Sequence, residues 1–192
     1  MPEPKTVLHE YLRTGRKVLL WKLEGISDYD VRRPMTPTAT NLLGIVKHVA
    51  SVEAGYLGDC FERPFGQEFP WFAEDAEDNA DMWATAEESR ESIIDLYQRV
   101  WEHSDTTIAA LDLDATGYVP WWAEQRRHAT LQQILVHMIA ETHRHAGHAD
   151  IVRELIDGSA GVRPGGGNLP DQDPAWWAGY YERVEKAAGE FK

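Results

Sequence analysis

With 192 residues, the chain is long enough for one domain with a proper core, predicted to span residues 1–192, and too short for two comfortable ones. Its 19 Lys and Arg against 32 Asp and Glu give a net charge of −13. This balance argues against a nucleic-acid surface and against binding to anionic membranes, because both depend on basic residues. Apolar residues make up 43% of the chain, and no run approaches the roughly 18 consecutive apolar positions that a membrane span needs.

The start of the chain is charged and periodic, and it has neither the apolar block nor the small-residue cleavage site of a signal peptide. We therefore expect a cytoplasmic protein whose first helix begins near residue 6. The single cysteine, Cys60, excludes an internal disulfide and a cysteine-type zinc site. No activating partner for Cys60 is evident, so it is interpreted as a small, half-buried residue.

Four long helices are predicted, and no convincing strand. The first covers residues 6–23, and the second, 42–61, carries apolar residues at the three- and four-residue spacing of one buried face. A long acidic and aromatic loop leads to the third helix, 89–111. Thr130 can cap the fourth helix, and Gly158 suits its end. A turn over 159–174 precedes a short terminal helix with an aromatic face. The prediction is an all-α four-helix bundle with a short C-terminal helix and room for a crossover connection.

The fourth helix contains an unusual cluster of chemistry-bearing residues, "HMIAETHRHAGHADIVRE", residues 137–154. On a helical wheel, Glu141 and His145 fall in the middle of the apolar stripe, whereas His137 and His148 fall at its edge. A buried glutamate is costly unless it is paired or binds a metal. Four residues apart, Glu141 and His145 are separated by roughly 6 Å of helix rise, which suits two ligands of one divalent cation.

A third ligand is expected from a facing helix, and His48 is the histidine that the second helix offers. Two histidines and a carboxylate with open positions are typical of a catalytic transition-metal site rather than a closed structural one. Zinc is favoured, and nickel and iron accept the same ligands. His137 and His148 are predicted to lie on the rim. Trp121, Trp122 and Arg126, just before the fourth helix, are candidates for the mouth of a substrate or cofactor pocket, with a solvated loop as the alternative.

The stretch "TNLLGIVKHVASVE" and the later pattern "E-x-x-R-H-A-G-H-A-D-I-x-R-E" together resemble the DinB-like superfamily, in the branch that includes mycothiol-dependent enzymes. The resemblance implies a four-helix bundle with up-down-down-up topology and a metal held by His48, Glu141 and His145. Many relatives have histidine where this chain has Glu141, and glutamate is similar to the mycothiol-dependent isomerase and transferase branch. His148 or Arg144 would then orient the ligands.

For the enzymes that the chain resembles, the implied chemistry is delivery of a thiolate. A divalent metal lowers the pKa of a low-molecular-weight thiol such as mycothiol, and the sulfur attacks a small electrophile, which gives transfer, or isomerisation if the thiol later leaves. Two alternatives remain open at this point. The same site could activate water, as in a metal-dependent hydrolase, or the chain could be a non-catalytic stress or binding protein. A homodimer is also left open.

Overall fold

The computed structural model describes residues 2–165 and 169–192, so part of the predicted turn, at 166–168, lies outside the described residues. The chain divides into two compact units, Met1–Ala160 and Gly161–Lys192. The single domain over 1–192 stays a prediction. None of the helices in the described part of the chain combines the length and apolar character that a membrane crossing would need.

Helices dominate the described chain, which confirms the mostly helical fold predicted from the sequence. Each long helix begins at a side chain that caps its backbone N–H groups, and the longest begins with a full capping box at Thr130. The α-helices described are α1 (Pro4–Trp21), α2 (Asp28–Arg32), α3 (Leu42–Leu57), α4 (Arg90–Ala110), α5 (Leu131–Asp157) and α6 (Pro174–Gly189).

A small antiparallel sheet corrects the prediction that the chain is purely α-helical. Strand β1 (Thr116–Tyr118) pairs with β2 (His128–Thr130) in the connection that leads to α5. Each strand has three residues, which is too short to display a two-residue alternation in the sequence. The pair brings the segment between the strands back to the start of α5.

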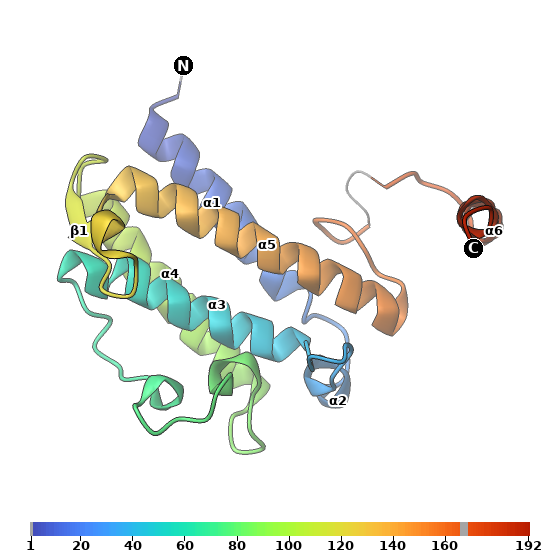
Figure 1. Ribbon diagram of the computed structural model, residues 1–192, viewed down its shortest axis with the longest axis horizontal. Helices are drawn as coiled ribbons and strands as arrows, with labels where there is room; N and C mark the ends of the chain where they lie inside the picture. Colours follow the sequence, from blue (N-terminus) through green and yellow to red (C-terminus); the bar gives the residue numbers. More distant parts are fainter. Residues whose placement is uncertain (1, 166–168) are drawn as a thin grey trace. The chain divides into compact units, whose positions relative to one another are not determined.

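In the first unit, α3 packs against both α4 and α5, and α1 runs beside α5 (Figure 1). Helix α3 is buried almost all round, as its apolar sequence requires. On α5, the buried residues include Ile134, Met138 and Val152, which the helical wheel placed on the core face. His143 is half-buried, because its ring lies where α5 meets Gly15 of α1.

A buried ion pair connects α1 to α3. Arg16 donates two hydrogen bonds to the Glu53 carboxylate, at 3.1 and 2.6 Å, and a third to Asp105 of α4, at 2.6 Å. Burial disfavours the charge on Arg16, but Glu53 and Asp105 outweigh it, and the pKa of the guanidinium lies above its ordinary value. Removing Arg16 would leave the Glu53 carboxylate buried and alone, at a cost of about 3–5 kcal/mol.

The loop between α3 and α4 is held against α3 near its first turns. Lys47 donates hydrogen bonds to the carbonyl oxygens of Ala80 and Trp83, each at 3.0 Å, and pairs with the Glu88 carboxylate at 2.9 Å. The ammonium group also lies 4.1 Å from the ring centroid of Trp71. One buried lysine therefore fixes a loop that has little regular structure of its own.

The same loop approaches the backbone of α3 at Gly44. A Cβ atom at Gly44 would lie 1.8 Å from the backbone oxygen of Met82, so only glycine allows this contact. Asn41, the cap of α3, completes the contact by donating from its side chain to the Met82 oxygen at 3.0 Å. The short 3-10 helix η3 (Ala80–Met82) is thereby seated on α3.

We expect Gly44→Ala to destabilise the protein by about 1–3 kcal/mol, because the added methyl group displaces backbone rather than a flexible side chain. Urea unfolding followed by circular dichroism measures the change. Gly147→Ala is the matched control: Gly147 lies in α5 with nothing within 4 Å of its added Cβ, so that variant should gain about 0.5–1 kcal/mol. Equal stability of Gly44→Ala and the wild type would contradict the described loop packing.

Candidate metal centre

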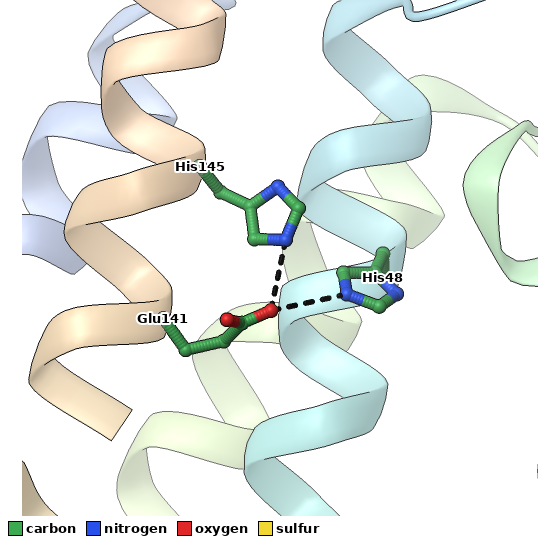
Figure 2. A group of neighbouring side chains, drawn as sticks. All are labelled: His48, Glu141 and His145. Atoms are coloured by element: carbon green, nitrogen blue, oxygen red, sulfur yellow. Dashed lines mark hydrogen bonds and ion pairs between the residues drawn. The ribbon is translucent and has the colours of Figure 1, made fainter. Parts of the chain in front are cut away.

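Three potential metal ligands meet where α3 faces α5. His48 comes from α3, and Glu141 and His145 come from successive turns of α5 (Figure 2). The carboxylate oxygen Oε1 of Glu141 lies 3.0 Å from Nε2 of His145 and 3.6 Å from Nε2 of His48. The structure thus brings together the three residues that the sequence singled out.

His48 is oriented by a carboxylate on its other ring nitrogen. Its Nδ1 lies 2.6 Å from Oδ2 of Asp81, which is part of η3. A carboxylate at this position accepts the Nδ1 proton and leaves the lone pair on Nε2, the nitrogen that faces Glu141. The loop that Lys47 and Gly44 hold against α3 therefore serves the site, because it carries Asp81.

His145 is nearly fully buried, with 4% of its surface exposed. Burial, the neighbouring His48 and the Arg144 guanidinium lower the pKa of His145 to about 4, so the ring is neutral near pH 7. Its Nδ1 is buried without a hydrogen-bond partner among the described residues. Neutral imidazole is the form that binds metals, so the environment keeps His145 in that form.

Glu141 is held as a carboxylate. Partial burial opposes its charge, but the hydrogen bond from Arg144 and the proximity of His145 lower the pKa of Glu141 to about 2. One terminal nitrogen of Arg144 lies 2.6 Å from Oε1 of Glu141 and 2.7 Å from Nε2 of His145. The guanidinium thus places a positive charge against the same two atoms that would ligate a metal.

The three donor atoms fit one divalent ion. They all lie within 4.8 Å of one another, and the oxygen of Glu141 lies 3.0 Å from the nitrogen of His145 and 3.6 Å from that of His48. Ligands at about 2.1 Å in a tetrahedral arrangement are separated by about 3.4 Å, so little side-chain movement is needed. Two neutral imidazoles and one carboxylate leave further positions for a thiol or water.

A pocket with a volume of about 600 Å³ adjoins these donors. It runs along one face of α3, because its lining residues from this helix recur at three- and four-residue intervals from His48 to Tyr56, and Asp59 follows directly after the helix. Eight residues of helix separate His48 from Tyr56, which corresponds to about 12 Å. His137 and Glu141 line the opposite side, so two of the three metal-ligand candidates open onto the pocket.

Aromatic side chains form much of the pocket wall. The hydroxyl oxygen of Tyr56 accepts hydrogen bonds from the indole nitrogens of Trp121 and Trp122, at 2.9 and 2.7 Å. The Tyr56 ring also lies 4.6 Å from the ring of His137, and burial lowers the pKa of this histidine. Phe72 and Trp121, each 54% exposed, mark where the pocket reaches solvent.

The other residues singled out from the sequence lie at varying distances from the pocket. Trp121 and His137 line it, whereas Trp122 contacts it through Tyr56. His148 is exposed, with its ring centroid 5.4 Å from that of His145. Arg126 is exposed over the ring of Trp122 at 5.9 Å and is not among the lining residues.

Sequence reasoning missed Asp81, Tyr56 and Asp59. Nothing in the acidic loop distinguishes Asp81 from its neighbours, because the contact with His48 depends on how the loop folds back. Tyr56 and Asp59 follow His48 by eight and eleven residues, so their position on its side of the helix was present in the sequence. This shared position indicated no function, because the sequence does not show that this side of the helix faces a cavity.

A family model described as Mycothiol-S-transferase matches residues 7–158, which is nearly all of the first unit. This family is part of the DinB-like superfamily, so the resemblance seen in the sequence is confirmed. No curated protein shows significant similarity to the chain.

Cys60 is buried, with 3% of its surface exposed, rather than half-buried as the sequence suggested. Burial, with a smaller effect of Asp59, raises the pKa of its thiol to about 12. We expect Ellman's reagent at pH 8 to label less than about 0.1 equivalent of native protein within minutes and one equivalent after denaturation in guanidinium chloride, because the reagent needs an accessible thiolate. Rapid stoichiometric labelling of the native protein would contradict this and make Cys60 a candidate nucleophile.

Proposed function

The chain belongs to the mycothiol S-transferase family, and we propose that it transfers the sulfur of a low-molecular-weight thiol such as mycothiol to a small electrophile, with a divalent metal at His48, Glu141 and His145. The observation that carries the proposal is the convergence of these three donors at the wall of a pocket of about 600 Å³. A thiol-related role follows from the family, and metal dependence rests on the donor set.

When bound, a divalent metal would supply a Lewis acid that lowers the pKa of the thiol, and zinc is the ion that we favour. The protein's own residues do the rest. Asp81 keeps the Nε2 lone pair of His48 directed at the site, and burial keeps His145 neutral. The aromatic walls hold the electrophile and exclude water, which would compete with the thiol.

In the transfer reaction, a carbon–sulfur bond forms as the bond from that carbon to its leaving group breaks, and the bonding electrons depart with the leaving group. The thiol proton passes to solvent. If the acceptor is instead an unsaturated carbonyl compound, sulfur adds to carbon, and rotation followed by loss of the thiol gives isomerisation. Both outcomes require only a positioned thiolate and an electrophile held beside it.

We also propose that α1, α3, α4 and α5 form the up-down-down-up four-helix bundle of DinB-like proteins. The contacts of α3 with α4 and α5 and of α1 with α5 support this arrangement. A cytoplasmic location and a homodimer stay predictions. Sedimentation velocity would test the dimer.

We expect the wild type to bind close to one equivalent of divalent metal, and Glu141→Ala and His145→Ala to lose most of it, because each removes a donor from a three-ligand site. Elemental analysis of protein never exposed to chelator or a nickel column measures this. His128→Ala, an exposed histidine on β2, is the control and should keep its metal. Folded wild type without metal after incubation with zinc, nickel and iron would favour the non-catalytic alternative.

The working ligand of the site is tested separately. We expect metal-loaded protein to form a thioether from an alkylating electrophile only when thiol is added, with turnover that scales with thiol concentration. Ester or amide hydrolysis without thiol would instead support a metal-dependent hydrolase.

Asp81→Asn should weaken metal binding by about 10–100-fold without unfolding the protein, because the amide no longer fixes the protonation and orientation of His48. Competition with a chromogenic zinc chelator measures the affinity. Asp78→Asn removes an exposed carboxylate of the same loop and should bind zinc like the wild type. If the two variants cannot be told apart, Asp81 does not position His48.

A further inference from the structure

The part of the pocket beyond the metal-ligand candidates has its own chemical character. Between His48 and Asp59, its wall is largely aromatic, with Tyr56, Phe72 and Trp121 among the lining residues. Tyr56 and Trp121 meet edge to face, with ring centroids 5.2 Å apart. A volume of about 600 Å³ is in the range of pockets that bind drug-sized ligands. Flat aromatic ligands suit such walls.

The charged groups that line the pocket are acidic. Glu141 is one of the metal-ligand candidates and is half-buried, whereas Asp59 follows directly after α3 and is exposed. Among the residues that the structure describes, no lysine or arginine lines it. Of the cations near the pocket, Arg144 pairs with Glu141, Lys47 binds loop carbonyl oxygens and Glu88, and Arg126 lies over the ring of Trp122 outside the lining. An anionic ligand would therefore meet Asp59 without a counter-charge among the lining residues, whereas Arg144 offsets the charge of Glu141.

The hydrogen-bonding groups of the wall also favour an uncharged ligand. The hydroxyl of Ser51 donates to the carbonyl oxygen of Lys47 at 2.7 Å and accepts from the indole of Trp71 at 2.9 Å, so the protein already uses it. The Tyr56 oxygen accepts from two indoles, which leaves its proton as the group to donate. A carbonyl, ether or nitro oxygen accepts one such bond, whereas an anion needs more donors to replace its water.

We propose that this pocket binds planar aromatic electrophiles that are uncharged or cationic and rejects anionic ones, and that Asp59 determines this selection. Calling the ligand the electrophile rests on the proposed transfer function; the selection by charge rests on the lining alone. Asp59 is the more exposed of the two lining carboxylates, so it is the one that a ligand can reach from solvent.

Two further observations agree with this selection. Desolvation raises the pKa of Asp59 despite an opposing effect of His103, which agrees with a carboxylate that lacks a basic partner in the lining. The net charge of −13 gives the surroundings the same sign as the lining. Approach of anions is therefore disfavoured both at long range and inside the pocket.

The test is direct binding to the full-length protein without thiol, by isothermal titration calorimetry. Three unreactive 2-naphthylmethyl probes differ only in their end group: trimethylammonium, methyl ether or sulfonate. A sulfonate is a poor metal ligand, so its affinity reports the lining and not a metal. At low ionic strength, we expect the sulfonate to bind at least about tenfold more weakly than the ether, and the ammonium at least as tightly as the ether.

Asp59→Asn should reduce the difference in binding affinity between the sulfonate and the ether to about threefold or less. Asp112→Asn makes the same change in net charge at an exposed residue that does not line the pocket. This variant should keep the difference in affinity between the two probes near its wild-type value. Equal or tighter binding of the sulfonate to the wild type would overturn the proposal, as would no detectable binding of any probe at millimolar concentration. Equal effects of the two variants would overturn the role of Asp59.

The two proposals fail in distinguishable ways. If thiol transfer is never observed but the probes bind in the expected order, the proposed function fails and the selection by charge stands. If thiol transfer occurs with an anionic aromatic electrophile as efficiently as with its neutral counterpart, the function stands and the selection fails.

Discussion

The buried ion pair between Arg16 and Glu53 constrains the rotation of α3, and the site depends on that rotation. Any turn of α3 that took Glu53 away from Arg16 would leave the Glu53 carboxylate uncompensated in the core, so one orientation is strongly preferred. Glu53 follows His48 by five residues, which places the two side chains about 140° apart around the helix. While Glu53 faces α1, His48 is directed elsewhere, toward α5.

Helix α3 thus combines three functions. One side holds the ion pair, whereas Lys47 and Gly44, which bind the loop, lie next to the side that supplies His48 and the pocket lining. The loop brings Asp81 to His48, so the packing of this irregular segment fixes the orientation of the His48 imidazole. Ligands carried by packed helices and supported by neighbouring hydrogen bonds are held more precisely than ligands carried by free loops.

Periodicity predicted the long helices, and on α5 it also selected Glu141 and His145, because a polar residue in an apolar stripe shows up on a helical wheel. It could not predict Asp81, whose contact with His48 spans 33 residues of chain without a repeating pattern. The two short strands escaped notice for the related reason that three residues carry no period. The acidic character of the pocket arises only when residues from several segments meet around it.

Arg144 gives the site a built-in competitor. Its guanidinium contacts the same oxygen of Glu141 and the same nitrogen of His145 that a metal would use, and half of its side chain is exposed. Uptake of the proposed metal would therefore be an exchange of one cation for another, and the net affinity would be the difference between two binding free energies. If Arg144 moved into water as the ion entered, Glu141 would stay paired throughout. The same arginine could return as the ion leaves, so it would influence how quickly the metal is exchanged as well as how tightly it is held.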